Sequence, residues 1–566
     1  MIMWKTLTEM MAYHAQTYPD SLYVRFLERG EVTGTYTYAQ MWAWASRWAA
    51  LLSDRGVRYG HAVLIALPNS EDFVGAYFGT LLAGGVPAPV APLRRLEAGN
   101  AALEVLAQRL NFVSGRVLVV PESQATVGEL EPLSQIEGLH VLTGRDLPPT
   151  AEAASPGGSA DDTALLQFTS GTSGKPKAVQ LSQFALLAQA RAISDALKLV
   201  RGVDWAVSWL PLFHDMGLIG YLLTPAYVAG DVSLIKVEDF ITRPNLWVKA
   251  LSDWKASITG GPPSAYAACA RRASEADVAQ YDLSRLRIAL VGAEMVRSSS
   301  LELFADKFER AGLRKSSLMP TYGLAENGLA VTMTPLDRGP RFDTIDLKVM
   351  QECGIAQPAQ PAQPSEVDGA SVREFASVGV PIMNTQVNIA GPEGEWLGER
   401  RIGEIAVCSP SLMTGYYEEP EQTAAILRDG WLYTGDMGYI VDGELYITGR
   451  KKEVLIVGGR NYYPDDLEAA VDGLEGIRSG RVVATSYEDP DVATEVVVVM
   501  AETALENPGE RSNLRLRIRN ALVEAGYPIG KVVLLPPRTI QTTPNGKLKR
   551  VECKVRYLAG EFNYDS

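Results

Sequence analysis

A run of small, hydroxyl-bearing and basic residues, Thr169–Lys177, has the composition of a phosphate-binding loop. Glycines let the backbone approach a ligand closely, hydroxyls and amides donate hydrogen bonds, and Lys177 supplies positive charge. The spacing differs from the G-x-x-x-x-G-K-[ST] pattern, which disfavours a P-loop kinase or GTPase. The alternative is a flexible Ser/Gly linker with a solvated lysine. The residues expected to contact phosphate are Thr169, Ser170, Gly171, Thr172, Ser173, Gly174 and Lys177.

The segments around this loop alternate between strand-like and helix-like patterns. Leu165–Phe168 is apolar and predicts a buried strand leading into the loop, and a helix is expected from Ser182 onward. Helical spacing also occurs at Leu7–Tyr18 and Tyr38–Arg55, with a short apolar run at Ala62–Pro68 between elements. This alternation predicts an α/β fold with a mainly parallel sheet.

Later segments continue the pattern and then change character. Short apolar runs at 206–211, 232–235 and 288–292 predict further strands between helices. Beyond about residue 375 the chain becomes a series of short strands and turns, such as 386–389 and 403–407, which predicts a β-rich subdomain.

Size and charge limit the possible functions. At 566 residues the chain exceeds the size of a single core, so two or more domains are expected. A net charge of −14 argues against nucleic acid or an anionic membrane surface as a partner. The four cysteines are widely separated and lack metal-ligand spacing, which favours a reducing, cytoplasmic compartment. The sequence contains no run of 18 apolar residues, so no membrane span is expected. The first 20 residues lack the pattern of an export signal.

Five short motifs occur in a fixed order along the chain. They are Thr169–Lys177, Tyr322–Glu326 (YGLAE), Tyr433–Asp436 (YTGD), Gly449–Glu453 (GRKKE) and Pro544–Lys547 (PNGK). In this order and at these separations they resemble the adenylate-forming superfamily of acyl-CoA synthetases, peptide-synthetase adenylation domains and luciferases. The resemblance covers nearly the whole chain. It implies a ligase that uses ATP and Mg²⁺ to form an acyl-adenylate.

The resemblance assigns nucleotide contacts to several of these residues. Tyr322 matches the aromatic residue that stacks on adenine, and Gly323 follows it in the same motif. Gly292 and Ala293 resemble the loop that lies against the adenine. Glu326 matches the carboxylate that holds Mg²⁺, a role that suits a hard cation shared with phosphate oxygens. The alternative for Glu326 is an ordinary surface glutamate.

Further matches lie near the C-terminal end. Asp436 matches the acid that accepts both ribose hydroxyls, and Arg450 matches a second ribose and phosphate contact. Lys547 matches the catalytic lysine that stabilises the pentavalent phosphorus, although a solvated lysine in a basic tail is the alternative. The superfamily places its interdomain hinge at the motif that contains Lys452. We therefore expect a large domain at 1–450 and a small, mobile α+β domain at 451–566.

An apolar motif at Trp209–Gly220 surrounds one histidine. Large apolar side chains around His214 suit a long acyl chain that ends in a carboxylate, and no residue in the motif offers a partner for the charged groups of an amino acid. The alternative is a core histidine with satisfied hydrogen bonds. The motif resembles that of fatty acyl-AMP ligases, which implies a role for His214 in catalysis. The expected pocket residues are Trp209, Phe213, His214, Met216 and Gly217.

A segment at about 336–375 follows the YGLAE motif and contains three Ala-Gln-Pro units. Proline at every third residue favours an extended path, and composition alone also suits a surface loop with no role. Fatty acyl-AMP ligases carry an extra segment at this place and commonly have alanine at the position of Ala325. The resemblance therefore implies activation of a fatty or related apolar acid to acyl-AMP, followed by acyl transfer to an acyl carrier protein thiol.

Two other functions stay open. An acyl-CoA ligase shares the adenylation step and differs only in its thiol acceptor, coenzyme A. A non-catalytic nucleotide-binding protein is a third possibility, against which the joint presence of Lys177, Glu326, Asp436, Arg450 and Lys547 counts.

Overall fold

The computed structural model describes residues 4–92, 101–124, 133, 135–169, 176–359, 372–457, 460–489, 494–525, 527, 530–542 and 548–562. Spatial contacts divide the chain into two compact units. The first unit comprises Met1–Pro340, Val378–Val387 and Val407–Leu432, and the second comprises Arg341–Ser377, Asn388–Ala406 and Tyr433–Ser566. The described part of the 336–375 segment from Arg341 onward therefore belongs to the same compact unit as the C-terminal residues. The sequence boundary near residue 450 stays a prediction.

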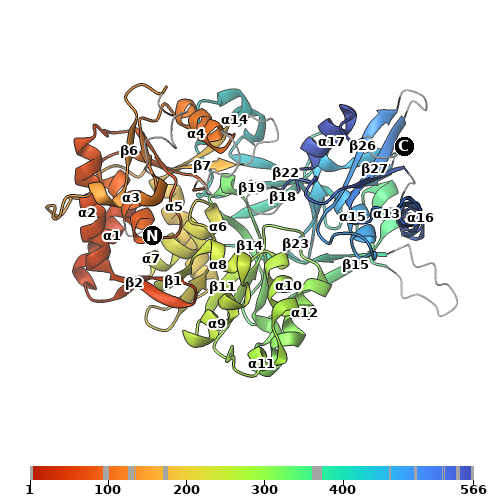
Figure 1. Ribbon diagram of the computed structural model, residues 1–566, viewed down its shortest axis with the longest axis horizontal. Coiled ribbons are helices and arrows are strands. Elements are labelled where there is room, and N and C mark those ends of the chain that lie inside the picture. The colour runs from red at the N-terminus through yellow and green to blue at the C-terminus, as the bar shows by residue number, and fades with distance from the viewer. Residues whose placement is uncertain are drawn as a thin grey trace. The chain divides into compact units, whose positions relative to one another are not determined.

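A nine-stranded sheet forms the centre of the first unit (Figure 1). The strands from β13 to β1 in the order given below run parallel, and antiparallel strands close both edges. β12 shows why the strands form here, since each of its four residues is apolar and buried, as expected for a parallel strand covered on both faces. The order is β17 (Val380–Pro381), β14 (Ala330–Met333), β13 (Leu318–Gly323), β12 (Ile288–Val291), β11 (Ile258–Gly261), β9 (Trp205–Ser208), β10 (Asp231–Ile235), β1 (Leu22–Glu28) and β2 (Glu31–Thr37).

A second, four-stranded parallel sheet and its helices confirm the predicted N-terminal elements. The strand order is β4 (Val86–Pro89), β3 (Ala62–Ile65), β5 (Val117–Val119) and β6 (His140–Leu142). The helices are α1 (Leu7–Thr17), α2 (Tyr38–Asp54) and α3 (Glu71–Leu82). α2 and α3 pack closely because Gly75 of α3 faces tryptophan, and a Cβ there would lie 2.4 Å from Trp44 Cδ1.

A three-stranded sheet carries the ends of the Thr169–Lys177 loop. Its order is β20 (Gly415–Tyr416), β8 (Lys177–Ser182) and β7 (Thr163–Thr169), with antiparallel pairing throughout. The helix α5 (Gln183–Ala196) begins directly afterwards, and the Ser182 side chain caps it by accepting from Ala185 N. The predicted strand before the loop and the helix from Ser182 are both confirmed.

The short strands beyond residue 375 form the expected β-rich part of the fold. A five-stranded sheet has the order β18 (Gln386–Ala390), β19 (Gly403–Cys408), β22 (Trp431–Val441) and β21 (Leu427–Arg428), and β23 (Glu444–Arg450) pairs with β22. The 336–375 segment contributes the antiparallel strand pair β15 (Phe342–Asp346) and β16 (Val372–Ala376), with α13 (Leu347–Cys353) between the two strands in sequence. Ile345 and Phe375 from this segment share a hydrophobic core with Tyr439, Tyr446 and Tyr463.

The C-terminal residues form an α+β layer within the second unit. The strands β26 (Val482–Asp489), β27 (Thr494–Glu502) and β28 (Lys531–Leu535) make one sheet, and β24 (Leu455–Val457) pairs with β25 (Arg460–Tyr462). The helices here are α15 (Pro464–Asp472), α16 (Pro508–Glu524) and α17 (Arg550–Leu558). No helix among the described residues has both the length and the apolar character needed to cross a bilayer.

A buried ion cluster fixes the start of α17. The Arg550 guanidinium lies 2.6 Å from Glu453, 2.5 Å from Asp465 and 2.7 Å from Glu468, and its side chain is only 16% exposed. Burial raises the pKa of Glu468, and the charge of Arg550 opposes that rise. The cluster therefore ties the residues after the predicted hinge, the start of α15 and the start of α17 to one cation.

We expect Arg550→Met to lower the free energy of unfolding of this region by about 3–5 kcal/mol, because three carboxylates lose their buried partner. Hydrogen exchange in peptides from α15 and α17 would measure the loss. The pKa of Glu468 should rise further, so the loss should be greatest at neutral and alkaline pH and should shrink as Glu468 takes up a proton in acid.

Arg556→Met is the matched control. Arg556 pairs with Glu561, which is about half exposed, so we expect a change of about 1 kcal/mol or less. Equal protection losses in the two variants would contradict a special role for the Arg550 cluster.

Candidate functional site

Several predicted site residues follow the carboxyl ends of parallel strands in the nine-stranded sheet. Trp209 follows β9, Gly292 follows β12, and Tyr322 and Gly323 end β13. Ligands of open α/β sheets commonly bind at this edge, because the loops that leave the strands are free to diverge there. The sheet thus gathers residues that are far apart in sequence.

The backbone around Tyr322 is tightly packed. The side chain of Tyr322 is 8% exposed, and a Cβ on Gly323 would lie 1.9 Å from the Leu329 carbonyl oxygen. On the neighbouring strand, a Cβ on Gly292 would lie 2.9 Å from Thr321 Oγ1. Ala293 has a φ of +67°, a conformation that non-glycine residues adopt mainly in constrained loops. These contacts hold the ends of β12 and β13 close together.

The two ends of the phosphate-loop candidate are set by strand pairing. Thr169 ends β7 and pairs with Lys177, which begins β8. Lys177 Nζ lies 3.4 Å from the centroid of the Tyr416 ring, a cation–π contact. The other predicted loop residues lie outside the described residues. They are Ser170, Gly171, Thr172, Ser173 and Gly174.

Glu326 and Tyr416 are joined by a short hydrogen bond. The Tyr416 hydroxyl donates to Glu326 Oε1 at 2.7 Å, and Met413 N donates to the Glu326 backbone oxygen at 2.9 Å. Burial and the neighbouring Glu326 carboxylate hold the pKa of the Tyr416 phenol well above its ordinary value, so the hydroxyl keeps the proton that it donates. The structure therefore connects Lys177 and Glu326 through Tyr416.

Tyr416 is a residue that the sequence analysis missed. It occupies a two-residue strand between turns, and no spacing pattern distinguishes it from the adjacent Tyr417. Only the pairing of β20 with β8, in which Tyr416 lies opposite Val179, brings its ring to Lys177.

The side chains near Glu326 fit a metal that is shared with phosphate. Within the described ranges, no group of three or more His, Cys, Asp or Glu side chains could hold a metal ion by itself. A single carboxylate with a second oxygen beside the one bonded to Tyr416 suits Mg²⁺, which keeps most of its ligands as water and phosphate oxygens. Glu326 would hold the ion in this arrangement.

Two polar side chains from other parts of the first unit form hydrogen bonds with the backbone of the Trp209–Gly217 segment. Asn69 accepts a hydrogen bond from Leu212 N at 2.9 Å and donates to the Leu210 oxygen at 3.0 Å. Gln167 of β7 donates to the Phe213 oxygen at 2.9 Å. The Gln167 bond links the segment to β7, the strand that leads into the phosphate-loop candidate.

Aromatic packing and one glycine complete this segment. Trp209 stacks on Phe240 with ring centroids 3.6 Å apart, and its Nε1 is buried without a hydrogen-bond partner among the described residues. His214 Nδ1 lies 2.6 Å from Asp215 Oδ1, and the His214 side chain is 31% exposed. A Cβ on Gly217 would lie 2.2 Å from the Pro211 oxygen, so glycine permits the turn. Phe213 and Met216 flank His214 in the same turn.

The second unit brings together two other predicted residues. Asp436 of β22 pairs with Arg450 of β23, and Arg450 Nε lies 3.3 Å from Asp436 Oδ1. Lys452 lies in the short 3₁₀ turn that follows β23, at Lys451–Glu453. Lys547 lies outside the described residues. The roles of these four residues stay predictions.

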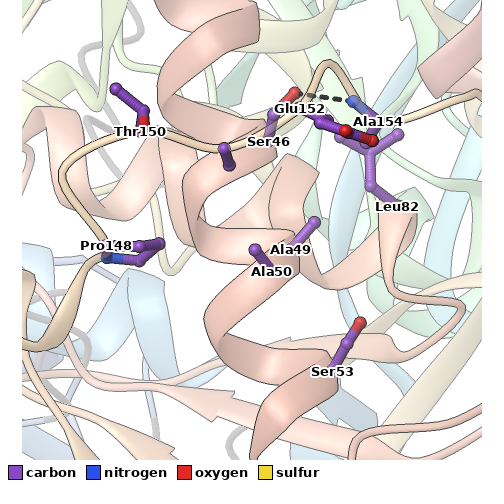
Figure 2. A pocket seen from close by; sticks show the side chains of 10 residues that line it. Ser46, Ala49, Ala50, Ser53, Leu82, Pro148, Thr150, Glu152 and Ala154 are labelled. Carbon is purple, nitrogen blue, oxygen red and sulfur yellow. Dashed lines mark hydrogen bonds between the residues drawn. The ribbon is translucent and has the colours of Figure 1, made fainter.

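A surface hollow of about 360 Å³ lies beside α2 (Figure 2). Ser46, Ala49, Ala50 and Ser53 of α2 line one side, and the 148–154 segment lines the other. Ser46 Oγ accepts a hydrogen bond from Ala154 N at 3.1 Å, which fastens that segment to the helix. None of the residues predicted from the sequence lines this hollow.

We expect Gly323→Ala to weaken ATP binding about 10-fold, because the added Cβ must displace the backbone beside Tyr322 and overpacking of this kind costs about 1–3 kcal/mol. Calorimetric titration with ATP would measure the change. Gly157→Ala is the matched control, since a Cβ there meets no atom within 4 Å. Unchanged ATP affinity in Gly323→Ala would argue against a nucleotide at this strand end.

Comparisons with known proteins identify the family of the chain. The family model described as AMP-binding enzyme matches residues 11–417. The "Putative acyl-CoA synthetase" of Caulobacter vibrioides is 35% identical over 539 residues, covering 94% of this chain and 92% of that protein. The "Medium-chain-fatty-acid--[acyl-carrier-protein] ligase JamA" of Moorena producens is 30% identical, covering 99% and 96%.

Solved structures show the same fold over the full length. A structure from work on fatty acyl-adenylate ligases of E. coli and L. pneumophila superposes with a TM-score of 0.89 at 30% identity, and the match covers 99% of both chains. This confirms the expected α/β architecture with a smaller C-terminal α+β part. The chain belongs to the AMP-binding enzyme family and is a ligase, and its close structural neighbours include fatty acyl-adenylate ligases.

Proposed function

We propose that this ligase joins a fatty or related apolar carboxylic acid to ATP, forms acyl-AMP and pyrophosphate, and then transfers the acyl group to the thiol of an acyl carrier protein. The observation that carries the proposal is the contact of Tyr416 with both Lys177 and Glu326. The Lys177 ammonium, which would bind phosphate, and the Glu326 carboxylate, which would bind a metal, both contact the Tyr416 side chain. The names of the relatives supply the substrate class and the acceptor.

The adenylation step needs charge and position more than covalent chemistry. A carboxylate oxygen of the acid attacks the α-phosphorus of ATP, a new P–O bond forms, and the bond to pyrophosphate breaks. Mg²⁺, if held by Glu326, would supply positive charge that offsets the charge of the phosphates. Lys177 and the Thr169–Gly174 loop would hold the β- and γ-phosphates, Glu326 would hold the metal, and Lys547 would stabilise the charge that develops on the phosphorus.

The remaining nucleotide contacts are proposed from the sequence motifs. Tyr322 with Gly323 and the Gly292–Ala293 loop would bind adenine, and Asp436 with Arg450 would bind the ribose. Arg450 pairs with Asp436, and an ionised carboxylate with two oxygens could also accept hydrogen bonds from ribose hydroxyls.

An apolar substrate suits the Trp209–Gly217 segment. Trp209 lies in an aromatic cluster with Phe240 and Trp247, and His214 with Asp215 forms a polar end to this segment. The apolar residues would contact the acyl chain, and His214 would lie near its carboxylate. The four cysteines are free, which suits the reducing cytoplasm as the location.

The choice of acceptor is supported by the 336–375 segment. Arg373 of β16 forms an ion pair with Asp466 of α15 and lies over the Tyr463 ring, so this segment holds residues beyond the predicted hinge. We propose that it restrains the small domain in the orientation used for adenylation, which leaves coenzyme A a poor acceptor. The name of the Caulobacter relative is that of the rival enzyme class, an acyl-CoA synthetase.

The decisive experiment measures pyrophosphate release with carboxylic acids of graded length, followed by transfer to coenzyme A or to a carrier protein that bears its phosphopantetheine arm. We expect acyl-AMP formation with apolar acids and preferred transfer to the carrier protein. Efficient acyl-CoA formation by the intact protein would favour the rival instead, and no pyrophosphate release with any acid would exclude both ligases.

Lys547→Ala should slow acyl-AMP formation by about 10²–10³-fold and leave ATP binding nearly intact, because the variant removes one preorganised charge from the transition state. Single-turnover acyl-AMP formation and ATP calorimetry would measure the two effects. Lys549→Ala is the matched control, since Lys549 pairs with Glu552 and has no proposed role. A wild-type rate in Lys547→Ala would remove Lys547 from the mechanism.

Arg373→Ala should raise acyl-CoA formation relative to acyl-AMP formation, because it releases the 336–375 segment from α15. Arg341→Ala is the control, since Arg341 of the same segment pairs with Glu444, before the predicted hinge, with a distance of 3.0 Å. The ratio of the two products in a chromatographic assay would report the effect. An equal rise in both variants would show that general loosening, and not the contact with α15, controls the acceptor.

A further inference from the structure

Tyr416 contacts two groups of opposite charge through two different parts of its side chain. The face of the ring lies under Lys177 Nζ at 3.4 Å, and the hydroxyl donates to Glu326 Oε1 at 2.7 Å. The two contacts are independent in chemistry, since the first uses the π-face and the second uses the O–H group.

The backbone fixes Tyr416 at this position. Tyr416 is 6% exposed, and it pairs with Val179 on the strand that begins at Lys177. Tyr416 N donates to Thr423 Oγ1 at 2.9 Å, and Met413 N donates to the Glu326 oxygen at 2.9 Å. The segment before Tyr416 is thus tied to Glu326, while its own strand is tied to Lys177. Little freedom remains for the ring to move away from either partner.

The hydrogen bond determines how the Glu326 carboxylate can meet a metal. A donor on Oε1 restricts rotation of the carboxylate and directs its other oxygen to an incoming cation. Hydrogen-bonding partners of metal ligands commonly change metal affinity 10- to 100-fold when they are removed. The cation–π contact similarly restricts the long Lys177 side chain, whose free rotation would otherwise be lost when it binds phosphate.

We propose that Tyr416 is a positioning residue for both charged groups of the phosphate site: its hydroxyl orients Glu326 for Mg²⁺, and its ring orients Lys177 for the phosphates of ATP. The inference rests on the proposed function, and it adds a residue and two separable effects. Tyr416 itself takes no part in the transfer of the acyl group.

The two effects are separated by substitutions that remove different parts of the side chain. Tyr416→Phe keeps the ring and loses the hydroxyl, whereas Tyr416→Leu loses both. Calorimetric titration with ATP in the presence of EDTA measures phosphate binding without a metal. Calorimetric titration of Mg²⁺ into a mixture of protein and ATP, without any acid substrate, then measures the Mg²⁺ dependence of binding. Its readout is the Mg²⁺ concentration that gives half of the maximal binding signal.

We expect Tyr416→Phe to bind metal-free ATP with nearly wild-type affinity and to need about 10-fold more Mg²⁺. Tyr416→Leu should show the same metal effect and also bind metal-free ATP about 3- to 10-fold more weakly. Unchanged Mg²⁺ dependence in Tyr416→Phe would overturn the role of the hydroxyl. Equal loss of metal-free ATP binding in Phe and Leu variants would overturn the role of the ring.

Tyr417→Phe is the matched control. Tyr417 packs against Phe112 with ring centroids 5.8 Å apart, and the Tyr417 hydroxyl interacts with Glu418. The Tyr417→Phe variant therefore also loses a tyrosine–glutamate contact. It should leave both titrations unchanged. A shift of the Mg²⁺ dependence in Tyr417→Phe as large as that in Tyr416→Phe would overturn the proposal, because it would trace the effect to general disturbance of β20.

A double-mutant cycle keeps the proposal testable even if Tyr416→Leu fails to fold. In a Glu326→Gln background, Tyr416→Phe should cause no further change in Mg²⁺ dependence, since the hydroxyl acts through the carboxylate. Additive effects would overturn the proposal.

The outcome is also distinct from that of the proposed function. Wild-type protein that binds MgATP but activates no carboxylic acid would refute the ligase function and leave the Tyr416 result standing. Active wild-type protein with an unchanged Tyr416→Phe titration would refute the Tyr416 role alone.

Discussion

The contact of one tyrosine with an ammonium and a carboxylate is the interaction on which the candidate phosphate site depends. Lys177 begins β8 and Glu326 follows β13, and these strands belong to different sheets. The ring and hydroxyl of Tyr416 bridge them. An ammonium and a carboxylate that lie close together tend to pair with each other. Because Tyr416 contacts both, it holds each group in a fixed position.

The strands that carry these residues are positioned by ordinary packing. Buried apolar residues of β12 and the close approach of Gly292 to Thr321 bring the ends of β12 and β13 together. Gly323 packs directly against the Leu329 oxygen. These contacts leave no room for an additional methyl group, so the packing of the strand ends sets the direction of the loops that follow. Hydrogen bonds with the side chains of Asn69 and Gln167 then fix the backbone of the Trp209–Gly217 segment.

The second unit shows how an inserted segment can become part of a core. Ile345 and Phe375 from the 336–375 segment pack with tyrosines of β22 and β23, while Arg373 pairs with Asp466 of α15. A segment held only by surface contacts would exchange freely between positions. Apolar burial together with a partly buried ion pair makes such exchange costly, and this physical difference underlies the proposed effect on the acceptor.

The fold class, the family and most of the named motifs could be predicted from the amino-acid sequence. Apolar runs and helical spacing predicted β7, β12, α1 and α2 within one or two residues, and the start of α5 within one residue. These elements are stabilised by local patterns of burial and by caps such as Ser182. The glycine at 323 was predicted as part of a motif, but its contact with Leu329 could not be predicted from spacing.

Which side chains meet depends on the pairing and packing of elements that are far apart in the chain. Tyr416 lies some 240 positions after Lys177, in a strand of two residues that has no periodic signal, and its pairing with β8 alone brings the two together. Arg550 likewise occurs in a basic run that suggests an exposed surface, yet three carboxylates from distant positions surround it. A sequence pattern records local burial and turn preferences. Long-range contacts depend on how sheets pair and pack, and those relations have no local signature.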